Sequence, residues 1–243
     1  MPLDITPPRQ QTTTAELHYL IRTPEKPARY VMEPPPGVPA WNGVATLVRN
    51  FYDPDEIKSV YYPEVERLLR ETLGASRVVV FDHNVRNGGR TDLPQPSRRV
   101  HNDHTVNSAP RRVRDHLDAE AEELLKHRFG VVNVWRPIRG PVLDSPLTLC
   151  DARSFTDDDL IASDLVYQHV RGETSSVEFN PRHRWYYFSE MQPDEAALIR
   201  VHDSADDGRA RLSFHTSFDN PLAPGAPPRE SIEARCLVFY PTT

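Results

Sequence analysis

The sequence contains few cysteines and few glycines for a chain of 243 residues. Its two cysteines, Cys150 and Cys236, have no cysteine or histidine close by in sequence, so neither a zinc cluster nor a redox pair is indicated. A chain with so few thiols, and no paired ones, fits a reducing, intracellular setting. The ten glycines form no phosphate-binding loop after a strand, which argues against the nucleotide-binding α/β folds.

Long apolar runs and an excess of positive charge are also lacking. No stretch approaches ~18 consecutive apolar residues, and the N-terminus lacks the basic and then apolar segments of a secretory signal. We therefore expect a soluble, cytoplasmic protein. The chain carries 29 Lys and Arg against 35 Asp and Glu, mixed along its length, for a net charge of −6. Neither nucleic acid nor a membrane is an expected partner, and composition does not fix the oligomeric state.

Proline is abundant instead, with 24 residues. It is excluded from helix interiors and central strands because it lacks an N–H donor, so many short elements joined by stiff loops are expected. A chain of this length fits one domain around one core. We expect residues 1–243 to form a single domain, in which N-terminal strands and a helix from residues 1–75 pack on a core of about residues 76–243.

Two helices are predicted in the first half of the chain. Short extended segments at residues 15–22 and 44–50 precede them, because apolar and polar residues alternate there as in a half-buried strand. Asp53 is placed to cap the first helix and Gly74 to end it. The second is predicted from about Pro110 to His127, where one apolar stripe runs along a charged segment.

Strand patterns dominate the rest of the sequence. Predicted strands span residues 78–81, 131–135, 148–151, 165–170, 176–179, 184–188, 197–201, 211–214 and 231–240. Since helices do not alternate with strands in the second half, a doubly wound parallel sheet is disfavoured. The pattern favours a mainly β fold with flanking helices and a jelly-roll, cupin-like core.

The segment around His101 has the pattern of a metal site. His101 and Asp103 lie two residues apart, which on an extended strand turns both side chains to one face. His215, at the end of a strand-like run, is positioned to supply a third ligand. Two histidines and one carboxylate occupy one face of an octahedral metal and leave the other positions open, as non-haem iron(II) oxygenases require. We predict that these three residues are the metal ligands and the catalytic centre.

A His-x-Asp pair alone is a weak signal, because the chain holds 10 His and 35 acidic residues and chance pairs are expected. His104 is the closest rival to His101 as a ligand. His83 and the pair His202-Asp203 lack the same strand context, so we assign them ordinary polar roles.

The segment after His215 strengthens the metal assignment. Arg229 and Ser231 share one face of a predicted strand, where a guanidinium pairs bidentately with a carboxylate and a hydroxyl adds a hydrogen bond. Such a pair suits the far carboxylate of 2-oxoglutarate. Arg235 has the same parity, so periodicity does not decide which arginine meets the cosubstrate. We rank Arg229 first and keep Arg235 in reserve.

Taken together, these motifs resemble a known family. They are carried by His101-x-Asp103 and by residues 133–138, 150–154, 185–188, 215–218 and 229–235. From about residue 20 onward the chain resembles the fungal and bacterial family of the aspergillic-acid hydroxylase/desaturase, the gibberellin desaturase and a cephamycin methoxylation protein. The resemblance implies a double-stranded β-helix core and dependence on Fe(II), 2-oxoglutarate and O2. It also implies hydroxylation, desaturation or ring formation on a small specialised metabolite, without fixing which one.

Substrate contacts are expected from predicted strands that border the metal, namely from Asn133, Trp135, Arg136, Tyr186 and Tyr187. Buried tryptophan and tyrosine are more often core residues than ligand contacts, and a structural role suits Arg136 equally well. Two other functions stay open from the residues alone. One is an iron oxidase that does not use 2-oxoglutarate, and the other is a non-catalytic jelly-roll protein that binds metal.

Overall fold

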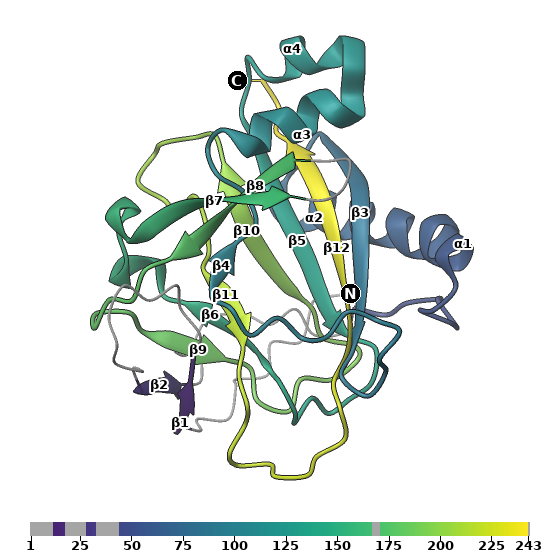
Figure 1. The fold of residues 1–243 in the computed structure, drawn as a ribbon. Helices are drawn as coiled ribbons and strands as arrows, with labels where there is room; N and C mark the ends of the chain where they lie inside the picture. Colours follow the sequence, from purple (N-terminus) through teal and green to yellow (C-terminus); the bar gives the residue numbers. More distant parts are fainter. Residues whose placement is uncertain (1–11, 18–27, 33–43, 167–170, 243) are drawn as a thin grey trace.

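The computed structural model describes residues 12–17, 28–32, 44–166 and 171–242, and its strands form two sheets (Figure 1). Among these residues, a four-stranded antiparallel sheet has the order β10 (Ala197–Asp203), β5 (Phe129–Pro137), β12 (Glu230–Phe239) and β3 (Arg77–Asn87). An eight-stranded sheet has the order β1 (Thr12–Glu16), β2 (Ala28–Met32), β9 (Trp185–Tyr187), β6 (Leu147–Cys150), β11 (His215–Ser217), β4 (His101–Asn102), β8 (Arg171–Val177) and β7 (Leu160–Val166). This architecture confirms the predicted mainly β, jelly-roll fold.

The first predicted helix is confirmed. It consists of α1 (Pro54–Glu56), a π-helical turn (Ile57–Tyr61) and α2 (Tyr62–Leu73). The Asp53 carboxylate accepts two backbone N–H groups of the first turn, at 2.9 and 3.3 Å. Gly74 ends the helix with φ of +65°, a conformation that glycine adopts without strain.

The second predicted helix is interrupted. In place of one helix over residues 110–127, the structure has α3 (Ser108–Leu117), a 3-10 turn (Asp118–Glu120) and α4 (Ala121–Leu124). Asp118 has φ of +35°, outside the helical region, so the chain changes direction there. The apolar periodicity is shared by both pieces and therefore concealed the break. Two further 3-10 turns lie at Ala152–Ser154 and Asp157–Asp159.

Residues 44–50, predicted as an extended segment, form no strand. The backbone N–H of Leu47 donates to the Glu64 carboxylate at 2.7 Å, and that of Asn50 donates to Glu56 at 3.0 Å. Helix side chains thus take the place of a neighbouring strand.

Several other predicted strands have different bounds. The strand predicted at 211–214 begins only at His215 as β11, and the one predicted at 165–170 starts earlier as β7. The segment 15–22 overlaps only the end of β1, and residues 18–22 and 167–170 lie outside the described residues.

The four-stranded sheet separates an outer core from an inner one. Even-numbered residues of β12 and β5, such as Ala234 and Val134, pack in the outer cluster with Val65 and Leu69 of α2. Leu237, on the opposite face of β12, belongs to the inner cluster. Alternation along a strand therefore places the odd-numbered polar residues of β12 on the inner face.

Candidate metal centre

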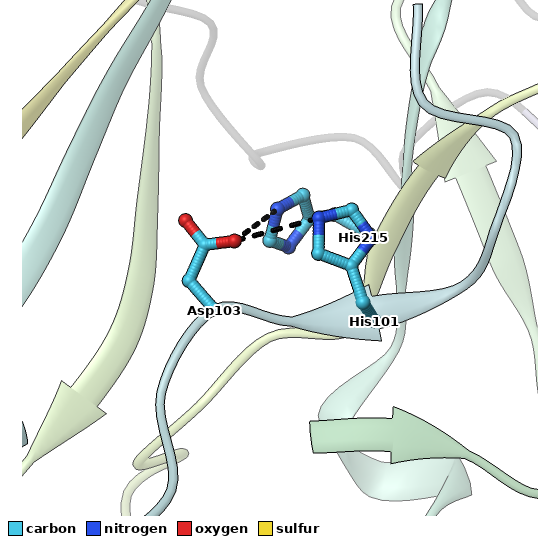
Figure 2. A group of neighbouring side chains, drawn as sticks. All are labelled: His101, Asp103 and His215. Carbon is cyan, nitrogen blue, oxygen red and sulfur yellow. Dashed lines mark ion pairs between the residues drawn. The ribbon is translucent and has the colours of Figure 1, made fainter. Parts of the chain in front are cut away.

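Two short strands bring distant parts of the chain together. His101 on β4 and His215 on β11 are direct partners in the antiparallel pairing of these strands, and their ring centres lie 4.4 Å apart. Asp103 follows directly after β4. Figure 2 shows the three side chains pointing toward one another. The predicted ligands are thus neighbours in space although His215 is far from the other two in sequence.

The three side chains present one donor atom each to a common point. Asp103 Oδ1 lies 3.4 Å from His101 Nε2 and 3.9 Å from His215 Nε2 (Figure 2). One ligand atom from each residue lies within 4.8 Å of the others. Among the described residues, these three form the group of His, Cys, Asp or Glu side chains that could hold a metal ion. His104, the rival ligand, is not a member of it.

The remaining ring nitrogens fix the tautomers of both histidines. His101 Nδ1 lies 2.7 Å from the Arg99 carbonyl oxygen, and His215 Nδ1 lies 3.0 Å from the Ser213 carbonyl oxygen. A carbonyl only accepts, so each Nδ1 carries a hydrogen, and in the neutral ring each Nε2 keeps its lone pair for a metal. The residues present therefore fit an iron(II) ion.

The second oxygen of Asp103 is held from the opposite side. Asn133 Nδ2 donates to Asp103 Oδ2 at 2.6 Å, and Arg235 Nε lies 3.5 Å from the same oxygen. Both partners project from the inner face of the four-stranded sheet. One carboxylate oxygen thus faces the histidines while the other is occupied by donors, an arrangement that suits a monodentate metal ligand.

Charges in the centre favour this ligand state. Burial opposes ionisation of Asp103, but the hydrogen bond from His101 and the charge of Arg235 hold the pKa of Asp103 well below its usual range. Burial, followed by the charge of His101, lowers the pKa of His215. Burial also opposes charging of His101, yet the hydrogen bond and charge of Asp103 raise its pKa. The centre is therefore a carboxylate with a neutral His215, and metal binding at His101 competes with a proton.

Arg229 is a buried cation without an anion. Its side chain is 5% exposed, Nη1 donates to the Ser145 carbonyl oxygen at 2.6 Å, and the guanidinium carbon lies 5.4 Å from the ring centre of Trp135. Within the described residues no carboxylate comes within ion-pair distance of it, and its Nε has no acceptor. Burial, together with the charge of Arg86, lowers the pKa of Arg229 to about 9. The neighbouring Ser231 hydroxyl is likewise buried without a described partner.

Arg235, in contrast, is surrounded by acids. It lies 2.8 Å from Asp82, 3.5 Å from Asp103 and 3.4 Å from Glu233. Burial opposes its charge, but Asp103 and Glu233 raise the pKa of Arg235 above its ordinary value. The two arginines that periodicity left equivalent therefore differ sharply in their surroundings.

Two adjoining cavities border the centre and share Arg86, Ser97, His101 and Arg235 in their walls. The larger has a volume of about 610 Å³ and reaches Asp103. The smaller, of about 30 Å³, lies between His215, Trp135 and Arg229. That volume is close to the share of one water molecule in liquid water, so it suits a terminal group and not a whole metabolite.

The residues predicted to contact substrate have different positions. Asn133 donates a hydrogen bond to Asp103, and Trp135 lines the smaller cavity together with Arg229. Arg136 points to the outer face of β5, where its guanidinium lies 5.8 Å from the Phe51 ring centre and donates to the Pro193 carbonyl oxygen. The prediction overlooked that neighbours on a strand face opposite sides.

Tyr186 and Tyr187 on β9 line neither cavity. The Tyr187 ring packs edge-on against Phe218 at 5.2 Å, within a hydrophobic cluster of the eight-stranded sheet. The other candidate histidines also have ordinary contacts: His83 bonds to the Tyr62 hydroxyl at 2.8 Å, and Asp203 pairs with Arg128 at 2.7 Å.

A β-bulge brings residues to the site that the sequence did not indicate. The register of β12 against β3 shifts between Arg235 and Cys236, which are opposite Asp82 and Val80. Phe81 is the extra residue, so both Phe81 and Asp82 border the larger cavity despite being adjacent. Nothing in the alternation of residues 78–87 signals such a shift.

Known proteins are similar to this chain over most of its length. A family model described as an oxidoreductase/YMDC permease-like domain matches residues 36–239. The hydroxylase/desaturase efuI of Hormonema carpetanum is 36% identical over 223 residues, which cover 81% of this chain and 75% of that protein. The Fe(II)/2-oxoglutarate-dependent dioxygenase nvfI of Aspergillus novofumigatus is 36% identical over 192 residues, which cover 77% and 69%.

Solved structures that are similar to this chain include those of NvfI. One structure of the iron and alpha-ketoglutarate-dependent endoperoxidase NvfI, described as having a different conformation, superposes with a TM-score of 0.78 and 26% identity, covering 96% of this chain and 98% of the other. A further NvfI structure gives 0.76 with 28% identity at the same coverage. Among the described residues, no helix has the length and apolar character needed to cross a membrane.

Proposed function

Because this chain belongs to the family of Fe(II)/2-oxoglutarate-dependent dioxygenases and hydroxylase/desaturases that includes these relatives, we propose that His101, Asp103 and His215 hold its iron(II). The protein is an oxidoreductase that uses Fe(II), 2-oxoglutarate and O2 to oxidise a small molecule. The observation that carries the ligand assignment is the convergence of two Nε2 atoms and one carboxylate oxygen within 4.8 Å.

Iron(II) bound here with 2-oxoglutarate and O2 supplies the oxidising power for hydroxylation, desaturation or ring formation. The chain's own residues orient that chemistry. The Arg99 and Ser213 carbonyls aim the two imidazoles, while Asn133 and Arg235 hold the second oxygen of Asp103. Outer contacts of this kind fix ligand geometry and tune metal affinity.

We assign the far carboxylate of 2-oxoglutarate to Arg229 and Ser231. A buried guanidinium without an anion gains strongly from a carboxylate, and the Ser231 hydroxyl is available on the same strand face. The smaller cavity joins this pair to His215 of the centre. Arg235 is already balanced by three acids, so we assign it a positioning role at Asp103.

The substrate is a small specialised metabolite held in the larger cavity. Trp135 lines the smaller cavity together with Arg229 and His215, and Asn133 acts on Asp103 in place of the substrate contact first expected. The contacts of Arg136, Tyr186 and Tyr187 favour structural roles. The relatives' dependence on 2-oxoglutarate favours this function over an oxidase that does not use it.

We further propose a cytoplasmic enzyme acting as one domain over residues 1–243. The buried free thiols of Cys150 and Cys236 and a ferrous ion are both compatible with a reducing compartment. The centre draws on β4 and β11 of the eight-stranded sheet and on β5 and β12 of the four-stranded sheet. Strands of the two sheets follow one another in turn along the chain, which supports a single domain.

Removal of single ligands tests the assignment. His101→Ala, Asp103→Ala and His215→Ala are each expected to abolish tight Co(II) or Fe(II) binding and succinate formation from 2-oxoglutarate, with circular dichroism unchanged. His127→Ala, at an exposed histidine that lies 3.8 Å from Glu123, is the matched control and is expected to bind metal normally. Metal-dependent succinate formation retained by Asp103→Ala would refute the assignment. Oxygen uptake without succinate would instead support the oxidase.

A further inference from the structure

The wall of the larger cavity carries more positive than negative groups. Its described residues include four arginines, Arg86, Arg99, Arg112 and Arg235, and two aspartates, Asp82 and Asp103. The chain as a whole has a net charge of −6, so this excess is local. A concave wall of one sign raises the local concentration of ligands of the opposite sign.

Both aspartates are already balanced. Arg235 lies 2.8 Å from Asp82 and 3.5 Å from Asp103, so one arginine serves both acids of the wall. Arg86 uses Nη1 to bond the Gln95 carbonyl oxygen at 2.6 Å, and no carboxylate of the described residues forms an ion pair with it. The remaining positive charge of the wall therefore rests on arginines that no acid of the same wall neutralises.

Arg99 and Arg112 are the arginines best placed to receive a ligand. In the described part of the chain no carboxylate lies within ion-pair distance of Arg99. Arg112 pairs with Asp115 at 3.3 Å, but the Asp115 side chain is 43% exposed, and such surface pairs exchange readily for other partners. Arg99 precedes β4 and Arg112 lies on α3, so they approach the cavity from two elements.

An aromatic surface accompanies these cations. The rings of Phe81 and His116 lie 5.0 Å apart with an angle of 31° between their planes, and both border the larger cavity. An unsaturated or apolar ligand skeleton packs well against such a surface. The wall thus combines a flat apolar area with unneutralised guanidinium groups.

The anion received here is distinct from 2-oxoglutarate. Arg99 and Arg112 line only the larger cavity, whereas Arg229 lines only the smaller one. With the far carboxylate of 2-oxoglutarate at Arg229, the cosubstrate leaves these two arginines free for a second acid. Arg86 lines both cavities and is therefore left out of the test.

We propose that the substrate of this enzyme is an anionic small molecule, a carboxylic acid or its equivalent, whose charged group binds Arg99 and Arg112. The inference rests on the proposed function, since it names the substrate class of the same centre. Its charged group fixes orientation, and the skeleton lies along Phe81 and His116 toward the metal ligands. A neutral analogue loses that anchor and binds more weakly.

The test compares two probes that share a ring system and differ in charge, 1-naphthoate and 1-naphthamide. Each is titrated by calorimetry into protein loaded with Co(II) and saturated with 2-oxoglutarate. We expect naphthoate to bind at least about tenfold more tightly, the effect of roughly one charge-assisted hydrogen bond. In the double variant Arg99→Gln/Arg112→Gln the ratio is expected to fall below about threefold, with the affinity for 2-oxoglutarate unchanged.

Two further variants keep the test decisive. Arg111→Gln changes the exposed neighbour of Arg112, which lines neither cavity, and is expected to keep the full preference. Arg112→Lys retains the charge and is expected to keep most of the preference for naphthoate over naphthamide. Equal affinity for both probes, no binding of naphthoate, or an unchanged ratio in the double variant would overturn the proposal. Failure to bind Co(II) or 2-oxoglutarate would count against the proposed function instead.

Discussion

Arg229, directly before β12, and Arg235, on β12, carry the same charged group, but their charges have very different surroundings. Arg235 is surrounded by Asp82, Asp103 and Glu233, within 3.5 Å in each case. In the described residues the Arg229 guanidinium donates to the Ser145 carbonyl oxygen at 2.6 Å and forms no ion pair, and only the backbone N–H of Arg229 contacts a carboxylate, that of Asp144 at 3.3 Å. A buried cation without an anion is unfavourable, so Arg229 is prepared to take a charged ligand and Arg235 is not.

Exchange of either arginine separates the two roles. Arg229→Gln is expected to raise the 2-oxoglutarate concentration needed for half-maximal succinate formation by about 10- to 100-fold, the loss of roughly 1.5–3 kcal/mol of charge-assisted bonding, with Co(II) affinity unchanged. Arg235→Gln is expected to weaken Co(II) binding by about tenfold or more, because a partner of a ligating carboxylate is lost.

The measurements are a Co(II) titration followed by visible absorption and a succinate assay over a range of 2-oxoglutarate. Arg229→Lys is the matched control, since it retains charge but loses the planar fork, and an intermediate effect is expected. A change in the cosubstrate requirement confined to Arg235→Gln would exchange the two assignments.

At the scale of single elements, the short strand β4 depends on Asn102. This side chain is fully buried and donates to the His104 carbonyl oxygen at 2.6 Å and to that of Val201 on β10 at 2.9 Å. The Thr174 hydroxyl donates back to the Asn102 carbonyl oxygen at 2.7 Å. Since β4 and β10 lie in different sheets, Asn102 ties the sheets together between two metal ligands.

Loss of the Asn102 hydrogen bonds is expected to lower both the stability of the fold and the affinity of the metal centre. Asn102→Leu keeps the approximate volume but leaves two carbonyl groups without donors, so the free energy of unfolding falls by about 2 kcal/mol. Co(II) affinity falls as well, because His101 and Asp103 flank the altered residue. Urea unfolding and Co(II) titration measure the two effects. Asn107→Leu, at an exposed position without a side-chain cap bond, is the control, and equal stability of both variants would contradict the role of Asn102.

Alternation and capping rules predicted the elements that depend on local chemistry. The Asp53 cap and the Gly74 end both follow from neighbours in sequence. The closeness of His215 to His101 and Asp103 agrees with the expected third ligand of a metal centre, and the ligand role itself stays a prediction. The helix predictions were confirmed because their cause lies within a few residues of sequence.

The predictions failed where partners are distant in sequence. The bulge that turns both Phe81 and Asp82 to the cavity arises from pairing with β12, which no local pattern reports. Residues 44–50 satisfy their backbone with Glu56 and Glu64 instead of a strand. Tertiary hydrogen bonds and register thus decided what periodicity left open.

At the scale of the whole molecule, the buried charge of Arg229 connects stability with cosubstrate binding. A pKa lowered to about 9 means that the folded state disfavours the protonated guanidinium, so this cost to folding is present at all pH values below about 9. An anion at the same place removes it. Sites that bind charged ligands often reduce the stability of the free protein in this way.

Replacement by an apolar residue should therefore separate stability from binding. Free Arg229→Met at pH 7.5 is expected to unfold at a temperature equal to or above that of the unaltered protein, because a desolvated cation is removed. The difference in unfolding temperature between Arg229→Met and the unaltered protein is expected to shrink as pH rises through about 9, where the guanidinium loses its proton. With metal and 2-oxoglutarate at about 100 times its Kd, the unaltered protein gains roughly 2.7 kcal/mol from the cosubstrate. The variant gains only the contribution of the metal. Differential scanning calorimetry measures all four states, and a variant that is less stable when free yet still stabilised by 2-oxoglutarate would show that Arg229 is a structural residue.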